Sequence, residues 1–200
     1  MSAPAGFLLV GAGGHAQGVA DAVRAAGGRV AAFADPHAAH WLADGGDAPA
    51  HHRDDEAARA AAVRDALALA LGLGGTDGEA LARRLALLDA YLDAGIAAPP
   101  VVHPTAVVAR SALMDEGVTV LARAVLQPFA HAHRGVLINT GAIVEHGARL
   151  GAGAHIGPGA IVLGGAEVGR AAMIGAGAVI LPGARAPDGA LVKALTRFPA

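Results

Sequence analysis

Residues 138–168 read INTGAIVEHGARLGAGAHIGPGAIVLGGAEV and divide into hexads that begin with an aliphatic residue and carry Gly-Ala at positions four and five. The same phase extends in both directions. Sixteen positions spaced by six, from Val102 to Val192, are all apolar, and Ala occupies thirteen of the fifteen positions that lie four residues further on. Val118 and Val136 are the two exceptions. A strict period of six fits neither a lone helix nor a hairpin.

A period of six is typical of a parallel β-helix with a triangular cross-section, in which three hexads make one coil. The aliphatic residue fills the interior, the Ala points inward near a corner, and the Gly permits a turn conformation that a Cβ disfavours. Sixteen hexads predict roughly five coils. A Gly/Ala-rich low-complexity tract is the alternative, but such tracts do not keep phase over fifteen steps.

Composition excludes several classes of protein. The formal net charge of -2 gives no strong attraction to nucleic acid or anionic lipid. The absence of Cys excludes disulfides and thiolate chemistry. The apolar runs at 7–10 and 66–73 are too short for a signal peptide or a membrane span. We expect a cytoplasmic protein without nucleic-acid or membrane partners.

The first hundred residues predict a Rossmann-like α/β domain. A strand at 7–10, a Gly-rich turn at 11–16, a helix at 17–26 and a strand at 30–34 form a βαβ unit. The pattern then predicts a loop at 37–53, a helix at 54–65, a strand at 67–71, a helix at 77–94 and a linker at 97–100. We therefore divide the chain into an α/β domain, 1–98, and a β-helix domain, 99–200.

The Gly-rich turn opens a helix, where backbone N–H groups and the helix dipole can hold a phosphate. Asp35, at the end of the second strand, can accept a hydrogen bond from a ribose or a base. By itself the pattern Gly11-x-Gly13-x-x-Ala16 is a weak signal, because a tight turn also needs glycine. The chain leads straight into the repeat and leaves no hydride-transfer domain, which argues against a nicotinamide oxidoreductase.

Four segments together resemble one family. They are the turn Gly-Ala-Gly-Gly-His-Ala at 11–16, Asp35, Val102-His103-Pro104, and Asn139-Thr140 with Glu145-His146. The chain resembles the bacterial sialic acid O-acetyltransferase and UDP-bacillosamine N-acetyltransferase family of hexapeptide-repeat acyltransferases. The resemblance implies a left-handed β-helix and a homotrimer with active sites between subunits. It also implies acetyl-CoA as co-substrate, no metal, and a sugar or nucleotide-sugar acceptor acetylated on an amino or hydroxyl group.

The resemblance also implies roles for individual residues. His146 is the expected general base, with Glu145 and Asn139 in the same catalytic site. His155 is expected to contact the acetyl-CoA thioester. The expected CoA-binding positions are His155, Gly157, Gly175 and Ala176, and the expected nucleotide-sugar positions are Gly13, Gly14, His15, Asp35 and Gly72.

Two departures from the family pattern stand out. Gly147 follows His146, where the family commonly has an acidic residue, so a carboxylate from another chain, such as Asp115 or Glu116, is a candidate substitute. The segment at 193–199 also departs from the family's C-terminal pattern. Lys193 and Arg197 are candidates for CoA contacts on charge alone.

Two other functions stay open. A non-catalytic, trimeric nucleotide-sugar-binding scaffold would explain Gly147. A zinc carbonic anhydrase on the same fold needs three imidazoles, and typically pairs two histidines five residues apart. His131 and His133 alternate along one strand and share a face, but no two repeat histidines are five apart.

Overall fold

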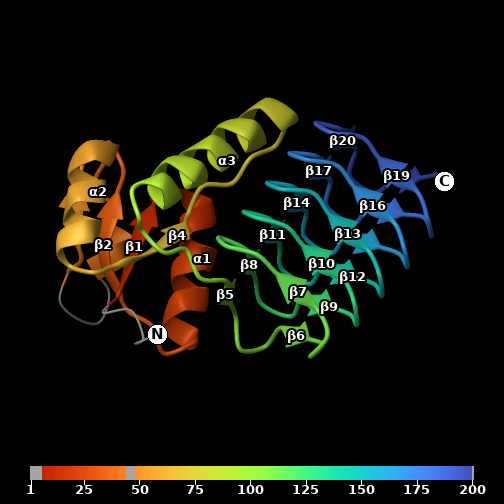
Figure 1. Ribbon diagram of the computed structural model, residues 1–200, viewed down its shortest axis with the longest axis horizontal. Helices are drawn as coiled ribbons and strands as arrows, with labels where there is room; N and C mark the ends of the chain where they lie inside the picture. The colour runs from red at the N-terminus through yellow and green to blue at the C-terminus, as the bar shows by residue number, and fades with distance from the viewer. Residues whose placement is uncertain (1–5, 44–47, 200) are drawn as a thin grey trace.

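The computed structural model describes residues 6–43 and 48–199, which form two domains along one axis (Figure 1). The N-terminal domain has a four-stranded parallel sheet in the order β3-β2-β1-β4. Its strands are β1 (Phe7–Val10), β2 (Val30–Ala34), β3 (Ala50–His52) and β4 (Ala68–Leu71). Its helices are α1 (Gly14–Ala25), α2 (Asp55–Arg64) and α3 (Gly78–Asp93), with a 3-10 turn at His40–Ala43.

The predicted strands and helices are present, with two corrections. Helix α1 begins at Gly14, three residues before the predicted start, because Gly13 takes an extended conformation and is the N-cap. The predicted loop at 37–53 is wrong in part, since it contains the 3-10 turn and strand β3. Strand β3 forms because it pairs with the free edge of β2, Ala32 opposite Ala50. Residues 44–47 of that loop lie outside the described residues.

Residues 101–198 form a parallel β-helix with three sheets, one on each side of a triangular prism. The domain-facing sheet contains β5 (Val101–Val102), β8 (Thr119–Val120), β11 (Leu137–Ile138), β14 (His155–Ile156), β17 (Met173–Ile174) and β20 (Leu191–Val192). The apolar-faced sheet contains β6 (Val107–Val108), β9 (Val125–Leu126), β12 (Ile143–Val144), β15 (Ile161–Val162), β18 (Val179–Ile180) and β21 (Arg197–Phe198). The charged sheet contains β7 (Leu113–Met114), β10 (His131–Ala132), β13 (Arg149–Leu150), β16 (Glu167–Val168) and β19 (Arg185–Ala186).

The hexad pattern dictates this geometry. Each strand ends on the aliphatic residue, which points inward, and positions such as Val144, Leu150 and Ile156 are fully buried. The Gly at position four has positive φ, +66° at Gly147 and +72° at Gly153, as the turn requires. The β-helix continues beyond the predicted end at Val192, because β21 adds a further strand.

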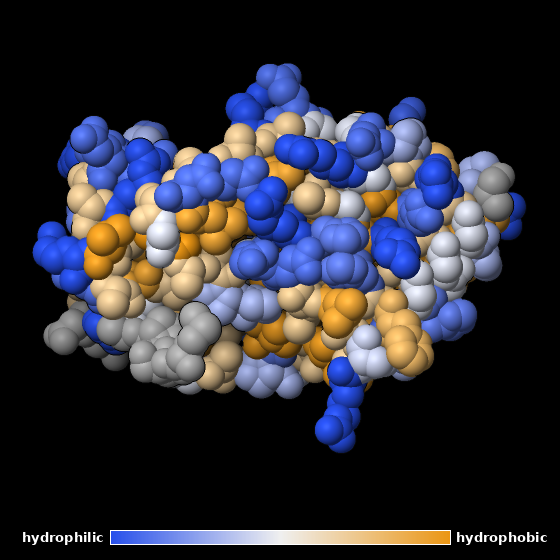
Figure 2. All heavy atoms as spheres, in the orientation of Figure 1, coloured by the Kyte–Doolittle hydropathy of each residue, from blue (hydrophilic) through white to orange (hydrophobic). Residues whose placement is uncertain are grey.

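The residue before each aliphatic position points outward, and its character differs among the three sheets. On the apolar-faced sheet this row is Val107, Val125, Ile143, Ile161 and Val179, followed by Arg197 on the last strand. On the charged sheet it is Leu113, His131, Arg149, Glu167 and Arg185. Figure 2 shows hydrophilic side chains gathered over the strands of the charged sheet.

The domain-facing sheet packs against the N-terminal domain. Leu137 joins a buried cluster with residues of α1, and Met173 contacts Leu81 of α3 in another. Polar contacts also cross between the domains, from Arg84 to the carbonyl of Gly135 and from His155 to the carbonyl of Gly75. The ion pairs His103–Asp21 and Arg134–Asp89 cross as well. No helix among the described residues is long and apolar enough to cross a membrane.

Candidate active site

His155 lies at the junction of the two domains and is only 6% exposed. Its Nδ1 lies 2.9 Å from the carbonyl oxygen of Gly75, and its Nε2 lies 3.1 Å from Nδ2 of Asn139. A carbonyl only accepts, so Nδ1 carries the proton and Nε2 accepts from the Asn139 amide. Asn139 is oriented in turn by the N–H of Thr140, which donates to Oδ1 at 2.8 Å.

His15 is close to this network, at the start of α1. Its ring centroid is 6.3 Å from that of His155, and its Nε2 is buried without a hydrogen-bond partner among the described residues. Burial lowers the pKa of His15 to about 4, helped by the nearby His155 and Arg84. Burial also lowers the pKa of His155, and Arg84 adds to this, although the hydrogen bond to Gly75 opposes it. Both rings are therefore neutral at physiological pH.

Arg84 is a residue that the sequence analysis missed. Its Nε donates to the carbonyl of Leu73 at 2.8 Å, its Nη1 donates to the carbonyl of Gly135, and burial lowers its pKa to about 10. The sequence pattern of the helix does indicate that Arg84 is buried, because Arg84 falls on the same helix face as the buried Leu81 and Leu88. An Arg on the apolar face of an amphipathic helix needs carbonyl or carboxylate partners.

The Gly-rich turn is open on its outer side. A Cβ placed on Gly13 or Gly14 would meet nothing within 4 Å, so a ligand has room to approach these positions. Asp35 accepts from the N–H of Ala12 at 2.9 Å and from the N–H of His37 at 2.8 Å. Burial raises the pKa of the Asp35 carboxyl, but these hydrogen bonds outweigh it, so the net shift is downward. The carboxylate thus stays charged beside the turn.

Gly72 has a different environment from the other predicted nucleotide-sugar residues. A Cβ there would lie 2.6 Å from the carbonyl oxygen of Gly11 and 2.8 Å from the Cβ of Ala16. The position therefore requires glycine for the close packing of β4 against the turn. The geometry gives Gly72 a packing role and no open side toward a ligand.

His146 lies at the turn between the apolar-faced and charged sheets, and it is exposed. Its ring lies over Gly164 in the next coil, where an added Cβ would come within 2.7 Å of Cε1 and 2.8 Å of Nε2. Among the described residues no side-chain hydrogen bond holds the His146 ring. Gly147 has a φ of +66°, so a carboxylate-bearing residue at that position would be strained.

The predicted CoA positions lie at a different corner, after strands of the domain-facing sheet. A Cβ on Gly157 would lie 2.6 Å from the carbonyl oxygen of Ile174, and one on Gly175 would collide with the backbone of Ala194. These glycines allow successive coils to stack. Lys193 and Arg197 are exposed on the last coil.

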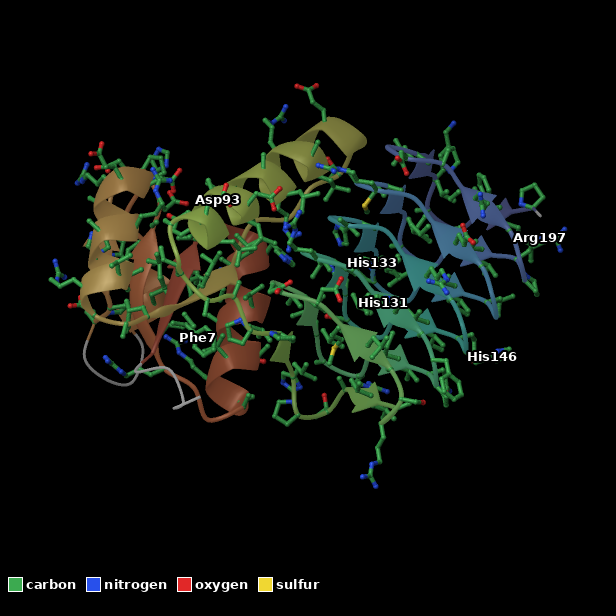
Figure 3. The ribbon with its side chains drawn as sticks, viewed as in Figure 1. Phe7, Asp93, His131, His133, His146 and Arg197 are labelled. Carbon is green, nitrogen blue, oxygen red and sulfur yellow. The ribbon has the colours of Figure 1, made fainter. Side chains whose placement is uncertain are left out.

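One chain therefore does not bring all the predicted catalytic residues together. His15, Asn139 and His155 meet where the domain-facing sheet contacts the N-terminal domain, whereas His146 is at a corner that this sheet does not share. Figure 3 shows His146 at an outer edge of the β-helix, well apart from His131 and His133. It follows β12, which lies between β9 and β15 in the middle of its sheet.

The family profile "Bacterial transferase hexapeptide (six repeats)" matches residues 147–182. No curated protein is significantly similar to the chain in sequence. Solved structures are similar over nearly the whole chain. PerB from Caulobacter crescentus, in complex with CoA and GDP-perosamine, is 31% identical with a TM-score of 0.84, over 98% of this chain and 92% of PerB.

Two further structures are similar. The acetyltransferase domain of PglB from Neisseria gonorrhoeae, in complex with acetyl coenzyme A, is 25% identical with a TM-score of 0.85, over 98% of this chain and 94% of that domain. A variant of the Caulobacter GDP-perosamine N-acetyltransferase with a histidine replaced by alanine is 30% identical with a TM-score of 0.78, over 99% of this chain and 95% of the variant. This likeness confirms the predicted fold class, and the chain belongs to the hexapeptide-repeat family of sugar acetyltransferases.

Proposed function

We propose that the protein transfers the acetyl group of acetyl-CoA to the amino group of a nucleotide-linked sugar. The observation that carries the proposal is the near full-length likeness to PerB, which is described with CoA and GDP-perosamine. We assign nucleotide-sugar binding to the domain at 1–98 and acetyl-CoA binding and catalysis to the β-helix at 99–200. N-acetylation is preferred to O-acetylation because the similar Caulobacter enzyme is an N-acetyltransferase. The cytoplasmic location stays a prediction.

In the proposed reaction the neutral amine attacks the thioester carbonyl carbon. The imidazole of His146 takes the proton that the amine loses, the C–S bond breaks as the carbonyl re-forms, and the CoA sulfur leaves with a proton from the imidazolium. No protein nucleophile is required. The Asn139 amide has two N–H donors, and one is used by His155. We assign the other to the developing oxyanion.

The remaining assignments follow the same geometry. Neutral His155 positions Asn139 and borders the thioester, while Gly157, Gly175 and Ala176 line the path of CoA. We assign nucleotide-sugar binding at the Gly-rich turn to Gly13, Gly14, His15 and Asp35. Gly72 packs against that turn and supports it. Glu145 lies beside His146 on the same turn and is assigned to the same site.

A homotrimer completes this site. From β6 to β18 the outward row of the apolar-faced sheet is a stripe of Val and Ile. Val107 is 63% exposed and the other four are partly exposed, and such a stripe favours contact with other copies. His146 lies on one edge of this sheet and Asn139 on the other. If three copies turn their apolar-faced sheets toward a common three-fold axis, the His146 edge of the sheet in one copy lies against the Asn139 edge of the sheet in the next. This arrangement would bring His146 to the Asn139 and His155 of a neighbouring copy.

The test is acetyl transfer to a panel of UDP-, GDP- and CMP-linked sugars, with and without an amino group, followed as free CoA with a thiol reagent. The protein has no Cys and adds no background. We expect release with one class of amino sugar, lost in His146→Ala and retained in His40→Ala, a matched exposed histidine. Binding of CoA or nucleotide sugar without release would favour the non-catalytic scaffold.

A second experiment tests the shared site. His146→Ala and Asn139→Ala are each expected to be inactive as pure trimers. Trimers reassembled from a mixture of the two contain interfaces in which an intact His146 faces an intact Asn139, so activity should partly return. Absence of any recovery in mixed trimers of confirmed composition would place both residues in a site within one chain.

A further inference from the structure

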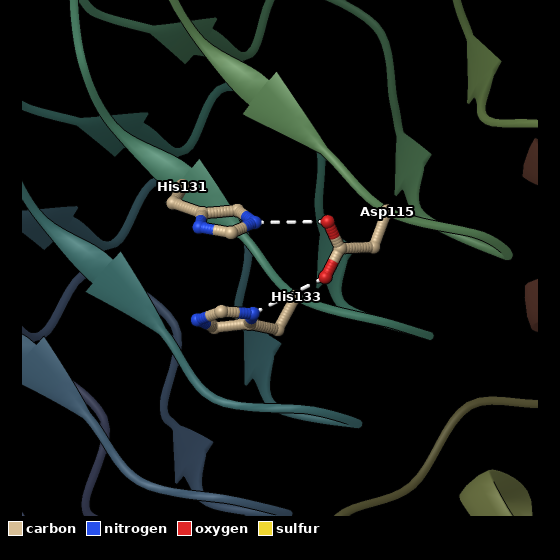
Figure 4. A group of neighbouring side chains, drawn as sticks. All are labelled: Asp115, His131 and His133. Carbon is tan, nitrogen blue, oxygen red and sulfur yellow. Dashed lines mark hydrogen bonds and ion pairs between the residues drawn. The ribbon is translucent and has the colours of Figure 1, made fainter.

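Three titratable side chains lie together on the outer side of the charged sheet. Strands β7 and β10 pair in parallel, with Leu113 opposite His131. Asp115 and His133, which follow these strands at a spacing of one full coil, are therefore stacked one above the other. His131 precedes His133 on the same side of its strand, as the sequence predicts. Asp115 enters from the coil before (Figure 4).

The donor atoms of this cluster converge. Nε2 of His131 is 2.8 Å from Oδ1 of Asp115, and Nδ1 of His133 is 3.1 Å from Oδ2. One ligand atom from each residue lies within 4.8 Å of the other two, and the imidazole centroids are 3.9 Å apart. Both rings thus direct a nitrogen toward a single carboxylate, and the three residues together offer one ligand atom each to a metal ion.

We propose that Asp115, His131 and His133 bind a divalent first-row transition ion, with zinc as the best match. Two imidazole nitrogens and one carboxylate oxygen are a ligand set that suits zinc, whereas calcium and magnesium prefer oxygen alone. With zinc about 2.0–2.1 Å from each ligand in a tetrahedral site, the ligand atoms lie about 3.3 Å apart. The observed distances of 2.8 and 3.1 Å run to the two different oxygens of Asp115, and the three ligand atoms lie within 4.8 Å of one another. Side-chain rotation alone, without a backbone shift, would be needed to bring them to the tetrahedral spacing.

The cluster is accessible to a hydrated ion. The side chains of Asp115, His131 and His133 are 36%, 22% and 38% exposed. His133 also lines a shallow groove of about 380 Å³ along the charged sheet. Three protein ligands on an open surface leave the remaining coordination positions to water.

This site is separate from the proposed acetyl-transfer site. Asp115 and His133 occupy the corner between the charged and domain-facing sheets, while His146 occupies the corner between the charged and apolar-faced sheets. The acetyl-transfer chemistry proposed above uses no metal, and zinc binding here would not supply any of its steps. The proposed metal site therefore does not depend on the proposed acetyltransferase function.

The test measures metal binding directly. Protein stripped with a chelator is titrated with zinc in competition with a chromophoric chelator, and bound metal is counted by elemental mass spectrometry. We expect one zinc per chain. Replacing a residue that only hydrogen-bonds a metal ligand typically weakens metal affinity about 10–100-fold. Asp115→Asn, His131→Gln and His133→Gln each remove a direct ligand, so each should weaken zinc affinity at least as much.

Controls make the result decisive, because the chain has ten histidines. His40→Gln removes an exposed histidine outside the cluster and should bind zinc as the wild type does. Cobalt in place of zinc should give a visible absorption band that each cluster variant loses. The metal-free variants should show the circular dichroism and elution volume of the wild type. Equal zinc binding by wild type and cluster variants, reflecting an adventitious ion only, or no binding at all, would overturn the proposal.

Discussion

Neutral His15 makes the stability of the fold depend on pH. Its pKa is about 4 in the folded protein and 6.5 as the ordinary value of an exposed histidine. Between these values the unfolded chain binds a proton that the folded chain does not, so unfolding becomes easier as pH falls. The contribution is fully present above 6.5 and is lost as the pH falls toward 4.

The size of the effect follows from these two values. Going from about pH 7.5 to about pH 5, the His15 contribution lowers the free energy of unfolding by about 2 kcal/mol. For a chain of 200 residues this corresponds to a fall of about 4–8 °C in Tm. The His155 pKa is also lowered by burial, so that residue adds to the same trend.

The assay compares wild type with His15→Gln, in which an amide that does not titrate replaces the ring. Urea unfolding is followed at a fixed protein concentration over this pH range, so that any effect of oligomerisation is the same in both proteins. The variant should lose about 2 kcal/mol less than the wild type on acidification. His40→Gln should keep the wild-type pH dependence. Parallel pH profiles for wild type and His15→Gln would refute the burial of a neutral His15.

Three further changes test other parts of the structure. Arg84→Met leaves the carbonyl groups of Leu73 and Gly135 without this donor and should lower the free energy of unfolding by about 2–4 kcal/mol in urea titrations. Gly164→Ala places a Cβ against the His146 ring and should reduce kcat for acetyl transfer, with CoA affinity by calorimetry unchanged. Ile143→Lys places a charge in the apolar stripe and should shift the trimer to monomer in light scattering, whereas Arg149→Ala on the charged sheet should not.

The β-helix could be predicted strand by strand because its signal is local and repeated. Every hexad repeats the same three demands, for an inward aliphatic residue, a small residue near the corner and a turn. A departure from the pattern in one hexad, such as Val118 or Val136 in place of Ala, does not alter the phase of the next hexad. The C-terminal boundary of the β-helix is harder to predict, because the repeat pattern weakens there. Strand β21 is not predicted, since Arg197 and Phe198 follow a segment without the Gly-Ala signature.

The N-terminal domain was predicted less completely, for a physical reason. Strand β3 has the sequence Ala-His-His, which has no strand preference of its own, and it is stabilised by pairing with β2. The contact of Arg84 with the carbonyl of Gly135 joins residues 51 positions apart. Such contacts depend on how the two domains pack, which no local pattern specifies.

The phase of the repeat nevertheless predicts which side chains can meet within one chain. Residues eighteen positions apart occupy the same place on successive coils, as Asp115 and His133 do, and as His146 and Gly164 do. Residues nine positions apart are half a coil apart and lie on different sides of the prism, as His146 and His155 do. In a rigid prism no rotamer change can close that separation. Chemistry that uses both His146 and His155 must therefore draw them from two copies of the chain, whereas a site built from Asp115, His131 and His133 is complete in one.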